Sequence, residues 1–393
     1  MAEHRETTAS PQLESEALGS PLLGFVKPLD GVRALAVLAV MGTHTGLMGF
    51  SGGSAGVDIF FVLSGFLITT LLLEEVDSYG RIYLGRFYAR RALRLFPALF
   101  TMLAVLAAYA MFGVNPDQRK ALLREVFFAG TYLYNFASTQ EIYLGHTWSL
   151  ALEEQFYLIW PLVLLACIRI RGERLLLIVT LGIVAFVASG RLAGVADPYS
   201  FYSERPDALL IGCAAAMLRR RGVHFGPWPG LTFTTAVSIG ILVLAVSTQG
   251  WLGRTAGLSV VAAAAAVLTL SLVAQPKSVP GRLLSARPLL EVGKRSYGIY
   301  IWHLPIFRWF ADQNFNIPDS VSVLLKYAAT FAVAWISFRF IEAPALRLKT
   351  RLRAPASPFA GVSSGNSRAA DNALSSSHQD PPRSELFDVA HGE

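Results

Sequence analysis

Long apolar blocks dominate this sequence and limit what it can fold into. A helix needs about 17–25 mostly apolar residues to cross the hydrocarbon core of a membrane, which is roughly 30 Å thick. The 393 residues are 53% hydrophobic and 16% charged, whereas soluble proteins are about one quarter charged. The pattern predicts an all-α, polytopic bundle of about ten transmembrane helices. The expected spans lie near 31–50, 55–74, 95–113, 148–168, 175–191, 201–218, 231–249, 254–274, 289–309 and 321–341.

Basic residues between the blocks predict how the chain is oriented. Lys and Arg accumulate in cytoplasmic loops, and such residues gather in "RIYLGRFYARRALR", "RIRGER" and "RRR". These loops share one side only if the weaker apolar segment 121–137 does not cross. We therefore expect a multi-pass protein of the inner (cytoplasmic) membrane with both termini in the cytoplasm. Segment 121–137 would be re-entrant or interfacial, and the alternative is eleven spans.

The chain divides into three predicted regions. Residues 1–28 form a polar N-terminal tail, 29–348 the transmembrane domain, and 349–393 a disordered tail rich in Ser, Ala and Pro. Cys167 and Cys213 lie in apolar blocks without a partner motif, so we expect neither a metal site nor a disulfide. The net charge of +7 follows from the basic loops and does not indicate nucleic-acid binding. Oligomeric state is left unassigned.

Arg33 and His44 are ionisable groups inside the first expected span. Their separation of 11 residues is about three helical turns, which places both side chains on one face, roughly 16 Å apart. Ionisable groups are costly inside a membrane and generally mark a functional path. The alternatives are an interfacial anchor for Arg33 and a hydrogen-bonded core histidine for His44.

A second histidine and a carboxylate are expected at a similar depth. His303 lies within "SYGIYIWHLPI", and Asp58 within "GVDIFFVLSGFLI". A buried carboxylate beside an imidazole would fix its tautomer and stabilise its protonated form. The sequence leaves open whether Asp58 meets His44 or His303.

Further polar side chains gather at the expected outer side, in "TWSLALEEQFYLIWPL" and "YSFYSERPDALLIG". They are read either as ion pairs and structural clasps or as groups that bind a sugar. These residues are the stripe Ser149, Glu153, Tyr157 and Trp160, the adjacent Glu154, and the pair Arg205 and Asp207.

Arginines form a stripe before the third span. Arg86, Arg90 and Arg94 are spaced at i, i+4 and i+8, with Arg91 beside them. The stripe is typical of a positive-inside anchor. It also suits a phosphate-bearing donor, because guanidinium binds phosphate in a bidentate manner, and both roles can hold together.

Seven ordered motifs resemble those of the acyltransferase family 3 membrane proteins, over about residues 29–348. Members of that family transfer acyl groups, often acetyl, onto hydroxyls of carbohydrates and glycosylated products. Some carry an added hydrolase-like domain, and this chain resembles the stand-alone type. The motifs are "LDGVRALAVLAVMGTH", "GVDIFFVLSGFLIT", "FYARRALRLFPAL", "TWSLALEEQFYLIWP", "ERPDALLIG", "SYGIYIWHLPI" and "FIEAPALRL".

The resemblance carries roles onto particular residues. The family's arginine–histidine signature, regarded as essential, falls on Arg33 and His44, and its late histidine falls on His303. Its arginine-rich cytosolic motif and its outer acidic and aromatic positions each fall on three residues. These are Arg90, Arg91 and Arg94, and Trp148, Glu153 and Glu154.

Together these observations predict a membrane O-acyltransferase without a permanent cofactor or metal. Its donor would be an acyl-CoA, expected to be acetyl-CoA, and its acceptor a glycan, a glycolipid or a glycosylated small molecule. His44 would act as general base, oriented by Asp58 or Glu153, and a covalent acyl-histidine is the alternative. The residues expected to bind the donor are Arg33, Arg90, Arg91 and Arg94. Those expected to bind the acceptor are Trp148, Glu154, Arg205, Asp207 and His303.

Two other classes of protein are the alternatives. A proton-coupled transporter would use His44, Asp58 and Glu153 as a relay. The sequence shows no internal repeat of the kind common in such carriers, and a carrier does not require the arginine stripe. A non-catalytic receptor or scaffold has no use for ionisable groups buried on one face.

Overall fold

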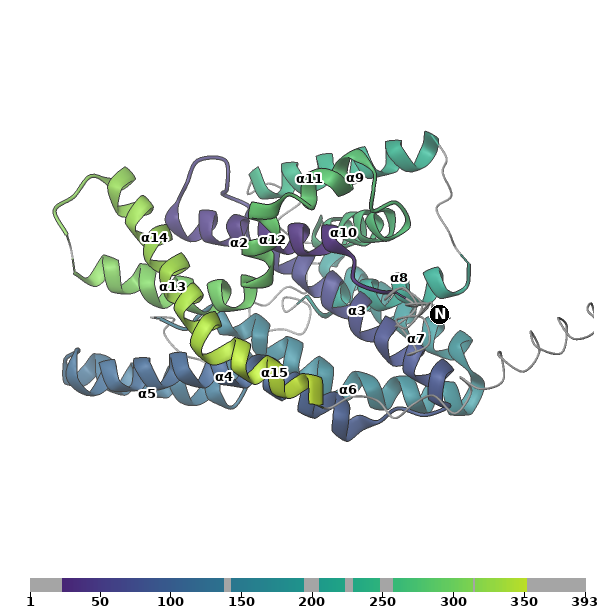
Figure 1. Ribbon diagram of the computed structural model, residues 1–393, viewed down its shortest axis with the longest axis horizontal. Helices are drawn as coiled ribbons and strands as arrows, with labels where there is room; N and C mark the ends of the chain where they lie inside the picture. The colour runs from purple at the N-terminus through teal and green to yellow at the C-terminus, as the bar shows by residue number, and fades with distance from the viewer. Residues whose placement is uncertain are drawn as a thin grey trace, which may run out of the picture.

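The structure is a computed structural model that describes residues 23–137, 143–193, 205–222, 229–247, 257–313 and 315–351. Within these ranges the regular secondary structure is entirely helical (Figure 1). The two expected tails, 1–28 and 349–393, lie largely outside them.

The helices follow one another through short connections. The first half of the chain holds α2 (Lys27–Thr45), α3 (Ala55–Tyr79), α4 (Leu84–Phe112), α5 (Pro116–Gly130), the 3₁₀ turn η1 (Tyr134–Phe136), α6 (Thr147–Arg171) and α7 (Glu173–Leu192). The second half holds α8 (Pro206–Arg220), α9 (Pro229–Ser247), α10 (Gly257–Ala274), α11 (Val279–Leu284), α12 (Arg287–Lys294), α13 (Ser296–Asp312), α14 (Asp319–Ser337), the π-helix η3 (Phe338–Glu342) and α15 (Ala343–Arg351).

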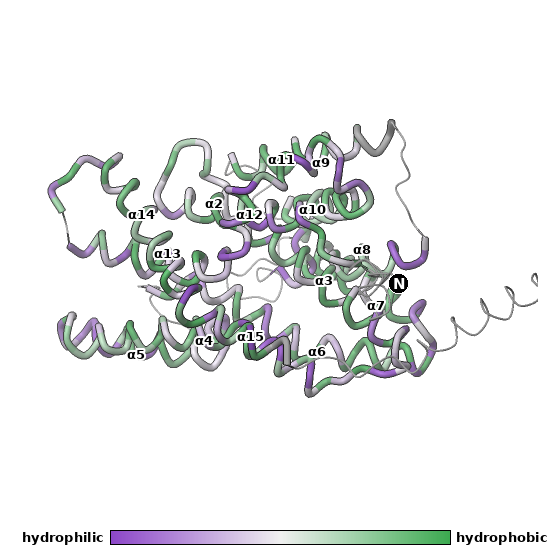
Figure 2. The backbone as a smooth tube through the Cα atoms, viewed as in Figure 1, coloured by the Kyte–Doolittle hydropathy of each residue, from purple (hydrophilic) through white to green (hydrophobic). Residues whose placement is uncertain are grey.

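Six helical segments in the described ranges are long and apolar enough to cross a membrane: α3, α4, α6, α7, α10 and the stretch Asp319–Leu348. The chain is therefore a multi-pass helical membrane protein, and hydrophobic residues, coloured green, recur along its helices (Figure 2). Counted by length and composition, the helices in the described ranges give fewer spans than the expected number of about ten. α8 and α13 have only 15 and 17 residues, fewer than the roughly 20 that a span needs.

The weak segment 121–137 does not form one straight helix. α5 covers its first part, begins with Asn115 capping the backbone N–H of Gln118 at 2.9 Å, and ends at Gly130. α5 packs antiparallel along α4 (Figure 1). Its 15 residues are too few to cross a membrane alone.

The expected single helix over 289–309 is wrong. The chain breaks at Arg295 between α12 and α13, where the backbone leaves helical geometry (φ −101°, ψ 5°). α12 is amphipathic and packs against the start of α2. Gly293 permits that contact, because a Cβ there would lie 2.0 Å from the Asp30 carbonyl oxygen.

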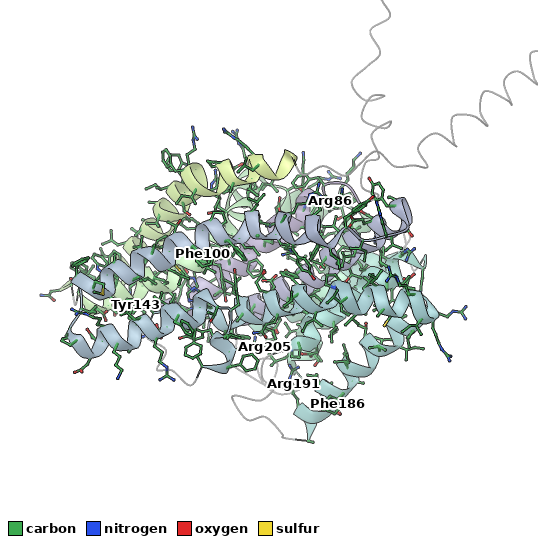
Figure 3. The ribbon with its side chains drawn as sticks, turned by 90° about the horizontal axis from the view of Figure 1, so that it is seen from below. Arg86, Phe100, Tyr143, Phe186, Arg191 and Arg205 are labelled. Carbon is green, nitrogen blue, oxygen red and sulfur yellow. The ribbon has the colours of Figure 1, made fainter. Side chains whose placement is uncertain are left out.

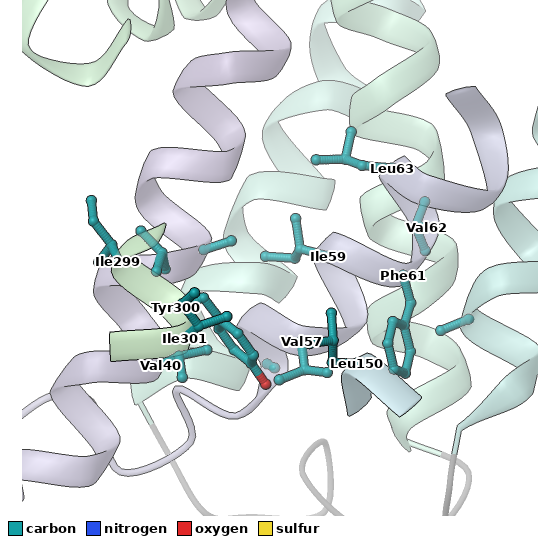
Figure 4. Close-up of a cluster of buried hydrophobic side chains, with 14 of the residues drawn as sticks. Val40, Val57, Ile59, Phe61, Val62, Leu63, Leu150, Ile299, Tyr300 and Ile301 are labelled. Atoms are coloured by element: carbon teal, nitrogen blue, oxygen red, sulfur yellow. The ribbon is translucent and has the colours of Figure 1, made fainter. Parts of the chain in front are cut away.

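Helices α3 and α8 pack closely against one another. A Cβ on Gly65 would lie 1.9 Å from the Leu209 carbonyl oxygen, and one on Gly212 would lie 2.2 Å from the Val62 carbonyl oxygen. Two helices can approach this closely only where both lack side chains. α3 therefore lies at the centre of the bundle, and buried aliphatic and aromatic side chains fill the space around it (Figure 4).

Candidate active site

Three imidazoles, from α2, from α13 and from the turn just before α6, meet near the C-terminal end of α2. His44 Nδ1 lies 3.3 Å from His303 Nε2, with ring centroids 5.1 Å apart. The ring of His146 lies edge-on to that of His303 at 4.9 Å. His303 is fully buried, whereas His44 is exposed. Of the cluster, His44 is thus the member that a substrate can reach.

Local sequence explains where His44 lies. Pro28 suits the first turn of α2, where its missing N–H costs nothing. Gly46 then ends the helix in a left-handed conformation (φ 66°) and donates its N–H to carbonyls of the last turn. His44 is therefore held in that last turn. Val40 of the same helix is buried near Tyr300 and Ile301 of α13 (Figure 4).

His146 is the functional candidate that the sequence analysis missed. It precedes α6, and on helical periodicity alone it belongs to the end of a span. Pro305 supplies the signal that could have found it, because a proline inside a helix leaves the carbonyl four residues earlier without its N–H partner. That carbonyl belongs to Ile301, and His146 Nε2 lies 3.2 Å from it.

Asp58 meets neither histidine that the sequence offered it. Its carboxylate pairs with Arg205 at 2.8 Å, and Arg205 also donates to the Ser54 carbonyl oxygen. Arg205 adopts a left-handed φ of 59° and lies 5.9 Å from the ring of Trp148. The two groups come from helices α3 and α8, whose close packing brings them together.

Asp207 lies in a neighbouring ion pair. Arg191 holds it through two bonds of 2.7 Å, Ser259 donates a third, and both charged side chains are about 2% exposed or less. Figure 3 shows Arg191 and Arg205 on the same side of the molecule. Both Asp207 oxygens are thus already occupied, which is the arrangement of a structural clasp.

Glu153 accepts hydrogen bonds from the hydroxyls of Ser64 and Tyr157. In the described residues, its hydrogen bonds therefore run to hydroxyls and not to an imidazole. The neighbouring Glu154 buries one carboxylate oxygen without a partner, close enough to Arg91 and Glu153 to interact electrostatically. In this geometry neither Asp58 nor Glu153 contacts His44, contrary to the prediction that one of them orients it.

The arginines of α4 point toward different helices. Arg91 lies over the ring of Tyr157 at 3.5 Å from its centroid. Arg94 is close enough to Arg33, Arg91 and Glu153 to interact with them electrostatically. Arg90 lies on the same helix, and Arg33 pairs with Asp30 at 3.0 Å.

Polar groups connect the arginines with the imidazoles. We call the set Arg33, Arg94, Glu153, Tyr300, His303 and His44 the polar track. Arg94 interacts electrostatically with Arg33 and Glu153, Glu153 with Tyr300, and Tyr300 lies 5.5 Å from the ring of His303. Helices α2, α4, α6 and α13 contribute to this track. Arginine near one end and an accessible imidazole at the other suit an anionic ligand whose reactive group lies away from its charges.

No group of three or more His, Cys, Asp or Glu side chains in the described residues could hold a metal ion. The fold is that of a multi-pass helical membrane protein, and the polar track ends at a cluster of imidazoles. The chain belongs to the acyltransferase 3 family, whose profile, described as an acyltransferase domain, matches residues 26–339.

Curated relatives agree with this membership. The chain is 34% identical over 354 residues to the peptidoglycan O-acetyltransferase OatA of Listeria monocytogenes, covering 81% of this chain and 56% of that protein. It is 33% identical to the putative peptidoglycan O-acetyltransferase YrhL of Bacillus subtilis, covering 81% and 55%. It is 30% identical to the O-acetyltransferase OatA of Staphylococcus aureus, covering 81% and 57%. The chain thus spans little more than half the length of these relatives. No solved structure matches it.

Proposed function

We propose that this chain is a membrane O-acyltransferase that moves an acetyl group from acetyl-CoA to a hydroxyl of a carbohydrate, with His44 as the general base. The observation that carries the proposal is the position of His44, exposed at the end of the polar track and hydrogen-bonded only through Nδ1 in the described residues. Family membership supports acyl transfer. The names of the relatives make a peptidoglycan sugar the first acceptor to test. Glycolipids and glycosylated small molecules are the other acceptor classes.

The proposed chemistry balances with one base. His44 Nε2 removes the proton from the acceptor hydroxyl as its oxygen attacks the thioester carbonyl carbon. The tetrahedral intermediate collapses, the carbon–sulfur bond breaks, and the thiolate takes the proton back from His44. The products are the O-acetyl ester and free coenzyme A. A covalent acyl-histidine would instead place the acetyl group on His44 before the hydroxyl attacks.

The donor would lie along the polar track. Its phosphates would bind the guanidinium groups of Arg33, Arg90, Arg91 and Arg94, because bidentate hydrogen bonds give arginine its affinity for phosphate. Its extended arm would then reach His44. Trp148, Glu154 and Arg205 remain proposed acceptor contacts, and both termini are proposed to be cytoplasmic. This arrangement would join a cytosolic donor to an acceptor at the outer face.

The test uses purified full-length protein in liposomes, acetyl-CoA and a soluble peptidoglycan fragment. We expect release of free thiol together with an acetylated fragment detected by mass spectrometry. His44→Gln should lower the rate about 10²–10⁴-fold, the usual contribution of a general base. Met48→Ala, at a 94% exposed loop position, is the control and should leave it unchanged. A His44→Gln variant with near wild-type rate contradicts the proposal. Radiolabel left on the protein without acceptor would favour the covalent route.

A further inference from the structure

We infer that His303 is a positioning residue that holds His44 in the tautomer protonated at Nδ1, leaving Nε2 bare to act as a base. The inference deepens the proposed function and rests on it. The sequence predicted that Asp58 or Glu153 orients His44. In this inference the second imidazole, that of His303, has that role.

A backbone carbonyl sets the tautomer of His303. Its Nδ1 contacts the carbonyl oxygen of Tyr300. A carbonyl oxygen only accepts, so Nδ1 of His303 must carry the proton and donate. Neutral His303 therefore has a bare Nε2, which can only accept.

The bare Nε2 of His303 in turn sets the tautomer of His44. Its Nδ1 lies 3.0 Å from the Val40 carbonyl oxygen and 3.3 Å from His303 Nε2. Both neighbours are acceptors, so His44 Nδ1 must be the donor. The second nitrogen, Nε2, is then the unprotonated one, and it belongs to the exposed ring of the pair.

Neighbouring side chains hold the ring of His303 in place. His146 lies edge-on to it at 4.9 Å, and Phe307 lies edge-on from another side at 5.7 Å. His146 is itself fixed, because its Nε2 contacts the Ile301 carbonyl oxygen that Pro305 leaves without a helical partner. Tyr300 closes the cage by donating to the His146 carbonyl oxygen at 3.0 Å.

The arrangement differs electrostatically from a carboxylate–histidine pair. When His44 gains a second proton, its Nδ1–H still has two neutral acceptors, so the cation is stabilised by hydrogen bonds and not by a counter-charge. The charged group that acts on His44 from α13 is Arg308, a cation.

Two amide variants of His303 separate positioning from packing. The terminal amide of glutamine reaches the place of Nε2, and that of asparagine the place of Nδ1. His303→Gln keeps an acceptor for His44, and His303→Asn keeps only the contact to Tyr300. We expect His303→Asn to lower kcat by about 100-fold or more, as loss of the correct tautomer does in a serine protease triad. His303→Gln should retain at least about one tenth of the activity, and KM for acetyl-CoA should stay unchanged in both.

The decisive readout is the tautomer of His44, taken from ¹⁵N spectra of histidine-labelled protein in liposomes without substrates. Wild type and His303→Gln should show a protonated Nδ1 and a bare Nε2 on His44, assigned by comparison with His44→Gln. His303→Asn should show a mixture. An unchanged tautomer in His303→Asn, or equal loss of kcat in both variants, overturns the inference. Because these spectra need no turnover, failure of the proposed activity would be seen separately, in the assay of wild-type protein.

Discussion

The arginines of α4 make different contacts, and these contacts determine which of them can bind the phosphates of a donor. Arg86 pairs with Glu75 at 2.6 Å and also lies over the ring of Tyr83. Arg91 lies over Tyr157 through its flat face, an arrangement that leaves the edges of a guanidinium available for hydrogen bonds. The stripe thus contains one arginine held by a carboxylate and one, Arg91, for which donor binding is proposed.

Lysine at position 91 should weaken use of the donor. Lysine keeps the charge but loses the planar fork that binds phosphate, so we expect Arg91→Lys to raise KM for acetyl-CoA about tenfold, which corresponds to about 1.4 kcal/mol. KM for the acceptor should be unchanged. The measurement is steady-state kinetics with each substrate varied in turn. Arg86→Lys is the matched control and should leave both KM values near wild type. Equal damage to donor and acceptor use by Arg91→Lys would favour a purely anchoring role.

At the scale of elements, α5 acts through one buried carboxylate. Glu125 is fully buried and accepts from the hydroxyl of Tyr134 at 3.0 Å and from the backbone N–H groups of Tyr143 and Leu144 at 2.9 and 3.1 Å. Tyr143 and Leu144 lie just before His146. α5 therefore holds the segment that leads into α6, and with it His146, whose ring lies against that of His303.

Replacing the Glu125 carboxylate should destabilise the segment that leads into α6. Glu125→Gln loses the charge and half of the acceptor capacity, so we expect a loss of about 1.5–3 kcal/mol, the range for hydrogen bonds to a charged group. The measurement is the midpoint of thermal unfolding of the purified protein. Arg124→Gln changes the exposed neighbour on the same helix and should stay within about 0.5 kcal/mol. Similar midpoints for the two variants would contradict the assignment.

Sequence periodicity was sufficient for some of these features and insufficient for others. It predicted helices at most apolar blocks and correctly placed Arg33 and His44 in one helix, α2, because an apolar block of that length favours a helix. It could not predict that Asp58 pairs with Arg205, 147 positions away, since the order in which helices pack is not encoded in hydropathy. It also missed His146, whose position depends on a proline in another helix.

At the scale of the whole molecule, the long axis runs from the α13–α14 and α4–α5 connections to the α3–α4 and α6–α7 connections (Figure 1). The predicted cytoplasmic, arginine-rich loops lie at the second of these ends. Cys167 and Cys213 are free and buried, which leaves the background for thiol labelling low. The orientation of the chain is therefore open to a direct measurement.

Single cysteines should report opposite sides of the membrane. Met48 is 94% exposed between α2 and α3, and Val279 is 67% exposed at the start of α11. With cytoplasmic termini, Met48→Cys should react with an impermeant maleimide in spheroplasts, and Val279→Cys only after the membrane is permeabilised. The parent protein without added cysteine is the control. Labelling of both positions from the same side would reject the proposed orientation.

The glycine contact between α3 and α8 restricts how substrates enter and leave. Even one methyl group on Gly65 or Gly212 would collide with a backbone oxygen, so these two positions accept no larger residue unless α3 and α8 separate. We expect so close a contact to hold the two helices together during turnover. An opening that admits a donor or releases a product is then expected between other helices, such as α4 and α6, where the long side chains of Arg91 and Tyr157 can change rotamer.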